Sequence, residues 1–118
     1  MANFILENRE LLKRRHYLLL ANQVTHWFNA APNVIKDYRA RYGDDFCIVL
    51  WRDGRDDDAY VIPFQRTKSL FTDQNLVGGT GDYLRWHGGI KGTHLSLRGT
   101  EDSVYVGDCY NAFHFLQT

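Results

Sequence analysis

The chain has 118 residues, which is enough for one domain with a core of its own and too few for two. Hydrophobic residues make up 44% and aromatic residues 14%, a composition that argues against a disordered or low-complexity chain. The formal net charge is zero, so bulk charge points to neither a nucleic-acid nor a membrane partner, and any binding face must come from local clustering.

The amino-terminal sequence predicts neither secretion nor membrane insertion. It does not open with a basic region followed by a sustained apolar stretch, as a signal peptide does. The apolar run 17–21 is far too short to span a bilayer. We therefore expect a cytoplasmic protein with no membrane partner. Cys47 lies in the apolar run 46–51, which favours a buried free thiol, and a bridge to Cys109 stays open.

Two helices are predicted in the first part of the chain. Residues 4–29 predict a long helix, because apolar residues recur there at three- and four-residue steps. The apolar stripe is wide, which indicates a helix covered on more than one side. The basic cluster 13–16 is either a solvated face or a phosphate-contacting ridge. Pro32 ends this helix and opens a second one, with Asn29 as a nearby cap and Gly43 as its terminator.

A β-hairpin is predicted next. Residues 46–51 are continuous, apolar and rich in β-formers, which is typical of a strand buried on both faces. A polar turn that contains the acidic run 56–58 leads to a second strand at 59–63. We expect the acidic run to be a solvated loop tip that protects the hairpin from edge pairing. Pro63 cannot donate a ladder hydrogen bond, so it ends the strand, and one or two helical turns follow as far as residues 70–71.

Shorter strands are predicted in the last part of the chain. Residues 72–82 are expected to form an exposed connection. Residues 83–87 and 93–97 alternate like half-buried strands, and the glycine-rich segment 88–92 would be the hairpin tip between them. A further short strand is predicted at 104–106.

These elements predict an α+β fold. Two amino-terminal helices, within residues 1–43, would precede a mainly antiparallel β-sheet or partly closed β-barrel within residues 44–118 of a single domain. Residues 112–116 form either a final strand or a helical turn, because periodicity does not decide over five residues.

The sequence contains none of the residue patterns that are typical of a catalytic site. Aspartates surround the first hairpin, but Gln65 and Lys68 stand three apart after its second strand, so the alternation that would aim an acid-x-lysine pair at one metal is missing. The five histidines show no paired short spacing, and the glycine runs match no phosphate loop. No nucleophile has a base beside it in sequence. We expect no cofactor and no metal, and the sequence favours a protein that is not an enzyme.

The sequence does contain residues that are suited to binding a nucleic acid. Between residues 65 and 98 five cations stand against two acids. Arginine and lysine can neutralise phosphates, glutamine can pair with an adenine edge, and tryptophan can stack on an exposed base. Four residues of this kind gather around one predicted hairpin: Trp86, His87, Lys91 and His94. Trp86 can equally be a core residue, because aromatic residues on alternating strands usually pack inward.

One segment resembles a known family. Residues 60–71, Tyr-Val-Ile-Pro-Phe-Gln-Arg-Thr-Lys-Ser-Leu-Phe, resemble the strand, Ile-Pro, short helix and Phe element of the B-three-like pseudobarrel DNA-binding domains. The wider run from residues 61–64 through 85–90 to 95–97 also resembles small recognition domains associated with HNH restriction endonucleases, and the resemblance covers roughly residues 46–107. The resemblance implies two DNA-gripping arms, which would fall on residues 52–55 and 86–91. The acidic run 56–58 departs from the family's basic pattern, because carboxylates repel phosphates, so the second arm is the better candidate.

We therefore expect a non-catalytic DNA-recognition domain, acting in a restriction or defence system on plain or modified double-stranded DNA, with any cleavage in another domain or in a nuclease partner. The expected DNA-binding residues are Arg52, Arg55, Gln65, Arg66, Lys68, Trp86, His87, Lys91, His94 and Arg98. The alternative is a protein-interaction module or small phage or bacterial regulator, with helix 4–29 as the surface of a homodimer. A stand-alone metal nuclease would depend on the aspartates alone.

Overall fold

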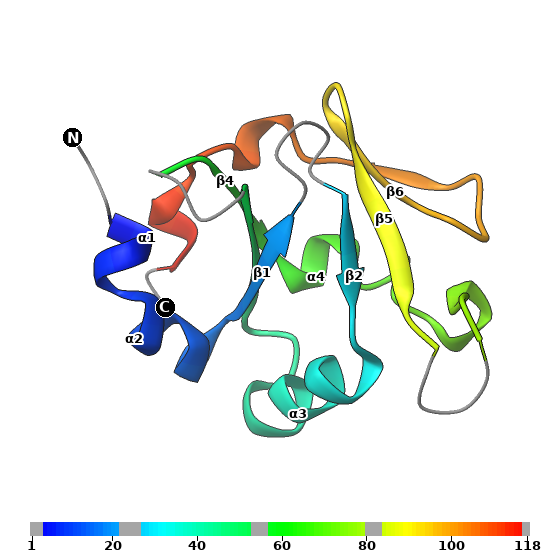
Figure 1. Ribbon diagram of the computed structural model, residues 1–118, viewed down its shortest axis with the longest axis horizontal. Helices are drawn as coiled ribbons and strands as arrows, with labels where there is room; N and C mark the ends of the chain where they lie inside the picture. The colour runs from blue at the N-terminus through cyan, green and yellow to red at the C-terminus, as the bar shows by residue number, and fades with distance from the viewer. Residues whose placement is uncertain (1–3, 22–26, 53–56, 80–83, 117–118) are drawn as a thin grey trace.

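The chain folds into layers of helices and sheets (Figure 1). The computed structural model describes residues 4–21, 27–52, 57–79 and 84–116. Its helices and strands run in the order α1 (Phe4–Glu7), α2 (Arg9–Arg15), β1 (Tyr17–Ala21), β2 (Phe28–Ala30), α3 (Pro32–Tyr42), β3 (Cys47–Arg52), β4 (Ala59–Pro63), α4 (Phe64–Thr67), β5 (Trp86–Lys91), β6 (His94–Leu97) and β7 (Ser103–Tyr105). The described residues also form the short 3-10 helices η1 (Asp73–Asn75), η3 (Gly107–Cys109) and η4 (Phe113–Leu116).

The strands form two sheets. The first sheet has the order β1-β3-β4 and the second sheet the order β2-β5-β6-β7. Strands β1 and β3 pair in parallel, and the other strand pairs are antiparallel. The predicted α+β class with mainly antiparallel pairing is confirmed. Among the described residues the two sheets do not close into a barrel, and the partly closed form stays a prediction.

The central strand of the first sheet, β3, is buried on both of its faces. In β3 the residues from Cys47 to Trp51 are all at most 3% exposed. On one face Val49 and its alternate neighbours pack against Ile5 and Leu12 of the amino-terminal helices. On the other face Ile48 and Leu50 pack toward the second sheet. The prediction of a strand buried on both faces is therefore confirmed.

The predicted helix over residues 4–29 is wrong. The α-helical backbone ends at Arg15, His16 is extended, and β1 begins at Tyr17. Residues 22–26 lie outside the described residues, and 28–30 form β2. A short apolar run is compatible with either a helix or a strand by periodicity alone. Pairing of residues 17–21 along β3 decides in favour of the strand.

The second predicted helix is confirmed as α3. Pro32 stands in its first turn, and Gly43 follows its last residue with a φ of 65°, which a glycine adopts without steric cost. The Gly43 N–H donates to the Arg39 carbonyl at 2.8 Å. Asn29 is not its cap, because Asn29 belongs to β2 and Ala31 occupies the N-cap position without a side-chain hydrogen bond.

Helix α3 is tied to the end of α2 by two tyrosines. The Tyr38 hydroxyl donates to the Lys13 carbonyl, and the Tyr42 hydroxyl donates to the Arg14 carbonyl at 2.8 Å. The last carbonyls of a helix have no partner within the helix. The two hydroxyls supply partners at the point where the chain turns from α2 into β1.

The predicted hairpin is confirmed as β3–β4, and its acidic loop has a structural role. Pro63 ends β4, and α4 follows directly. Residues 53–56 lie outside the described residues. Asp57 accepts the N–H groups of Phe4 and Ile5, each at 3.0 Å, where negative charge suits the start of α1. The expected solvated tip is therefore wrong for Asp57.

Asp58 is also bound within the fold. Its carboxylate forms an ion pair with Arg52 and accepts the Tyr110 hydroxyl at 3.0 Å. The solvated interpretation is wrong for this residue too, because it joins the hairpin to the carboxy-terminal segment.

The boundaries of β5 differ from the prediction. The strand covers residues 86–91, not 83–87, and the chain turns at Gly92 and Thr93 instead of over 88–92. Glycine-rich sequence indicated a turn, but here the glycines lie inside a strand. A Cβ atom on Gly88 would lie 2.4 Å from Leu97 Cδ2 and 2.5 Å from the Ser96 carbonyl oxygen. Close packing between strands therefore explains the glycine at this position.

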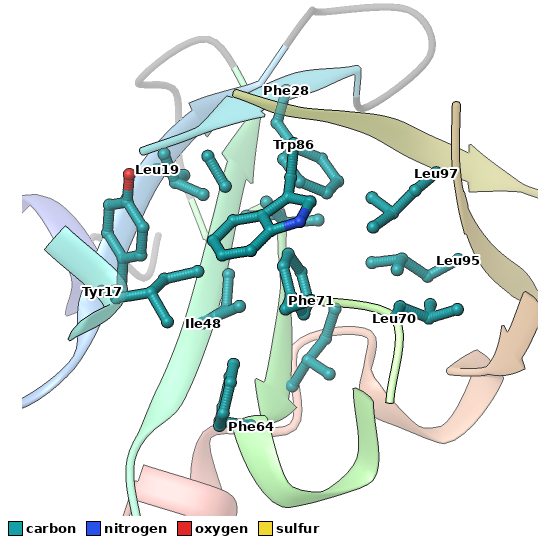
Figure 2. Packing of buried hydrophobic residues seen from close by; sticks show 14 of the residues in the cluster. Tyr17, Leu19, Phe28, Ile48, Phe64, Leu70, Phe71, Trp86, Leu95 and Leu97 are labelled. Carbon is teal, nitrogen blue, oxygen red and sulfur yellow. The ribbon is translucent and has the colours of Figure 1, made fainter. Parts of the chain in front are cut away.

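The core between the sheets gathers around Trp86 (Figure 2). This residue is 3% exposed, and its indole N–H donates to the Thr72 carbonyl at 2.8 Å. Its ring meets Phe71 edge-on at a centroid distance of 5.4 Å. Phe28 and Leu97 pack in the same cluster from neighbouring strands. The core interpretation of Trp86 is confirmed.

Residues 112–116 were predicted to form either a final strand or a helical turn. The structure has the helical turn η4 there.

We expect Gly88→Ala to lower the free energy of unfolding by about 1–3 kcal/mol, because the new methyl group meets a backbone carbonyl that cannot move independently. Gly89→Ala is the matched control. Its methyl group would lie 3.1 Å from the ring of Trp27, an exposed side chain that can shift. Urea unfolding followed by circular dichroism measures both variants. An equal loss in the two variants would contradict the explanation.

We also expect the free energy of unfolding to decrease as the pH is lowered, because of the buried side chain of His16. This buried side chain accepts the Cys47 N–H at its Nδ1, 2.9 Å away. Burial first, and then the charge of Arg15, lower the pKa of His16 from 6.5 to about 4, against weaker opposing effects of a hydrogen bond to the Leu116 backbone and of the Asp45 charge. The unfolded chain therefore binds more protons between these values, and stability falls as the pH drops through that window.

The expected loss is about 3 kcal/mol, complete below the pKa of the folded state. His16→Gln keeps an acceptor for Cys47 but has no proton to gain. The free energy of unfolding, measured at intervals from neutral to acid pH, should be flatter in this variant. Parallel profiles for the two proteins would show that His16 is not responsible.

Candidate nucleic-acid interface

Three of the expected DNA-binding cations are ion-paired within the fold. Arg52 pairs with Asp58, as described above. On α4 and just after it, Arg66 Nη1 lies 2.5 Å from Asp108 Oδ1, and Lys68 Nζ lies 3.2 Å from an oxygen of Asp44. A cation that is paired with a carboxylate attracts a phosphate less strongly, because the carboxylate partly neutralises its charge. These three side chains therefore hold loops together.

Arg66 has the most contacts of the three. Besides Asp108, its Nη1 lies 3.2 Å from Cys109 Sγ, and its guanidinium lies 5.5 Å from the centroid of the Phe115 ring. The hydrogen bond to Asp108 raises the pKa of Arg66 and lowers the pKa of Asp108. Arg66 thus joins α4 to η3 and η4. Gln65 is exposed on the same helix, and Arg55 lies outside the described residues.

The other expected residues lie on the second sheet, whose two faces differ. Residues opposite one another on antiparallel strands project from the same face. Phe28 lies opposite Gly88, and Gly88 opposite Leu97, and all three face the core. Their immediate neighbours along the strands project from the opposite side, which we call the outer face.

The side chains of the outer face form three rows across the strands. The first row is Asn29, His87 and Arg98; the second is Trp27, Gly89, Ser96 and Ser103; the third is Lys91, His94 and Tyr105. Every non-glycine residue of these rows is exposed or half-buried. The outer face therefore carries polar, cationic and aromatic side chains, whereas the inner face is apolar.

The second row is built around a contact between an aromatic ring and a glycine. The ring of Trp27, just before β2, lies against Gly89 of β5, where an added Cβ atom would stand 3.1 Å from the ring. Trp27 is 38% exposed. The guanidinium of Arg98 lies 5.7 Å from the centroid of the same ring. The tryptophan ring thus packs against the backbone of β5 at Gly89 and is still accessible to solvent.

A hollow lies at the end of the outer face that carries the first row. Its volume is about 400 Å³. The lining residues are Leu20, Trp27, Phe28, Asn29, His87 and Arg98. The hollow combines the apolar side chains of Leu20 and Trp27 with an amide, an imidazole and a guanidinium, so it can contact a flat polar molecule from several sides.

The charge of the outer face comes from two residues. Lys91 and Arg98 form no ion pair with any carboxylate of the described residues. The exposed acids Glu101 and Asp102 lie in the turn that follows Arg98. His94 at the other end stacks edge-on against Tyr105 at 5.7 Å. The face therefore keeps a cation at each end, with an aromatic ring between them.

The structure brings four of the ten expected residues onto one surface: His87, Lys91, His94 and Arg98. Two residues of that surface, Trp27 and Asn29, were missed because the sequence placed them in a helix. Only Phe28, Asn29 and Ala30 alternate between apolar and polar side chains, and three residues are too few to predict a strand. A glycine inside a strand marks a close approach by another group.

Both cysteines are buried thiols that we expect to be unreactive. Cys47 and Cys109 are buried free thiols, as predicted for Cys47, and they form no bridge. Burial raises the pKa of Cys47 to about 12 and that of Cys109 to about 11, so both stay protonated at neutral pH. In the parts of the chain that the structure describes, no three His, Cys, Asp or Glu side chains gather as a metal site.

None of the described helices has the length and apolar composition needed to cross a membrane. Comparisons with protein-family models, with curated proteins and with solved structures find no match to this chain.

Proposed function

We propose that this protein is a DNA-recognition domain that binds double-stranded DNA, plain or base-modified, with the outer face of its second sheet. One observation carries the proposal. Lys91 and Arg98, which have no carboxylate partner among the described residues, stand at opposite ends of the face, and the exposed Trp27 lies between them. Cations neutralise phosphates, and an exposed ring can contact bases.

The spacing of the cations suits a duplex. Lys91 is four residues along β5 from His87, the residue opposite Arg98, so the two rows are about 13 Å apart at a rise of about 3.3 Å per residue. The major groove is about 12 Å wide. In this proposal the two cations meet phosphates on either side of a groove.

The proposal moves the interface away from the first hairpin. The ion pairs of Arg52, Arg66 and Lys68 support a structural role for these residues. The domain would recognise DNA without cutting it, and cleavage in a restriction or defence setting would belong to a partner nuclease. We propose the cytoplasm as its location, since free thiols are typical of reducing compartments.

A second candidate function is self-association, in keeping with an interaction module or small regulator. Three large apolar residues of α1 and α2 are exposed: Phe4 by 40%, Leu6 by 52% and Leu11 by 61%. Exposed apolar groups that gather on one surface mark sites of protein association. The occupant of this surface would be a second copy of the chain.

We expect Lys91→Ala/Arg98→Ala to weaken binding to a labelled duplex by about tenfold or more at low salt. The plot of log K against log salt concentration should become shallower by about two, one for each lost phosphate contact. Fluorescence anisotropy measures both quantities.

The matched control is Lys13→Ala/Lys36→Ala, which removes the same charge from exposed positions on α2 and α3. Equal weakening in the two double variants would contradict the interface. If neither plain nor modified duplexes bind the native protein at low salt, the proposed class is wrong.

For the second candidate, light scattering of the native chain at high concentration should give the mass of a dimer. Leu6→Ser/Leu11→Ser should return it to a monomer, because each change removes apolar surface from the contact. A native chain that is monomeric at high concentration would remove this candidate.

A further inference from the structure

We propose that the hollow beside Trp27 is a subsite for one unpaired nucleobase, swung out of the DNA. The inference rests on the proposed function and adds what the outer face selects. It follows from three properties of the lining residues: a flat aromatic surface, a hydrogen-bonding edge and a cation for the adjoining phosphate.

The size and the walls of the hollow suit a flat heterocycle. Its volume of about 400 Å³ lies within the range of small-molecule sites, about 300–1,000 Å³. Leu20 of β1, which is 64% exposed, contributes an apolar wall, and Phe28 of β2, which is 4% exposed, lines the hollow without turning its side chain away from the core. The first and second sheets thus both contribute to the hollow, so its shape depends on how the two sheets pack.

Trp27 provides the stacking surface. One side of its ring is held against Gly89, so the ring has a fixed support, and the residue stays 38% exposed. The other tryptophans, Trp51 and Trp86, are 2% and 3% exposed and have no face for a ligand. Stacking on an aromatic ring tolerates every base, because each base has a π-face.

Asn29 and His87 provide the hydrogen-bonding edge. They lie directly opposite one another on β2 and β5, so their Cβ atoms are about 5 Å apart on the same face. An asparagine amide offers both donors and an acceptor, and a neutral imidazole offers one of each. The edges of bases carry donors and acceptors side by side, and asparagine pairs in this way with adenine.

Arg98 provides the cation. Its guanidinium lies beside Trp27 and has no carboxylate partner in the described part of the chain. A cation–π contact at an exposed position is weak, so the guanidinium can turn to a phosphate at little cost. Its five donors suit a phosphate oxygen pair. Glu101 and Asp102 in the following turn limit how many phosphates this end can accept.

The stacking surface decides that the base must be unpaired. In an intact duplex the faces of each base are covered by its neighbours, and only the edges are open. A ring such as that of Trp27 can cover a base only after the base has left the stack. The subsite therefore favours bases that leave the stack easily, such as unpaired, mismatched or weakly paired modified bases.

The test compares three duplexes of one sequence: fully paired, with one extra unpaired adenine, and with an abasic residue in place of that adenine. We expect the unpaired adenine to raise affinity at least about fivefold over the paired duplex, and the abasic residue to give no such gain. The adenine duplex should also quench tryptophan fluorescence, because Trp27 is the exposed tryptophan.

Variants separate the roles of the lining residues. Trp27→Ala should remove the preference for the unpaired base and leave the salt dependence unchanged, whereas Trp27→Phe should keep most of the preference. Asn29→Ala should reduce the preference for adenine over other unpaired bases. Gly89→Val should also reduce the preference, because its side chain displaces the ring without removing it. Circular dichroism confirms that each variant is folded.

Two failures are distinguishable. If paired and unpaired duplexes bind equally and no quenching occurs, the subsite is wrong, while the effect of Lys91→Ala/Arg98→Ala still decides the proposed function. If no DNA binds at all, the proposed function fails and the subsite with it. A preference for the unpaired base that persists in Trp27→Ala would also overturn the inference.

Discussion

The burial of β3 on both faces is the constraint from which the rest of the structure follows. Its residues from Cys47 to Trp51 are almost wholly withdrawn from solvent, so the strand needs an apolar cover on each side. Helices α1 and α2, with η4, form one cover. The second sheet forms the other. Only the inner face of that sheet packs against the core. Its outer face can therefore carry side chains that the fold does not require.

Charge is distributed in the same way. The chain has no net charge, and several of its cations are matched with acids at loops and element ends. Exposed ion pairs contribute little to stability, but the pairs of Arg15, Arg66 and Lys68 join segments far apart in the sequence. Asp58 joins the hairpin to Tyr110, and Asp108 joins α4 to η3. A neutral total therefore conceals a local excess of positive charge at Lys91 and Arg98.

The glycine pair of β5 connects the core with the outer face. Gly88 lets Phe28 and Leu97 close over the inner side of the strand, and Gly89 lets Trp27 lie flat on the outer side. Phe28 is the first residue of β2 and Trp27 directly precedes it, so one short segment, from far along the chain, reaches both faces of β5. The packing of β2 thus sets the core and the candidate interface together.

The sequence by itself determined the elements whose signals are local. The Pro32 start and Gly43 end of α3, the β3–β4 hairpin and the turn after Pro63 depend on backbone geometry or on a continuous apolar run, and all were predicted. The β-strand of residues 17–21 was decided only by its parallel partner, because the same pattern fits a helix. The candidate site needed the tertiary structure for the same reason: whether Arg66 is bound to an acid, or Trp27 lies beside Arg98, depends on residues distant in sequence, and no local pattern records such contacts.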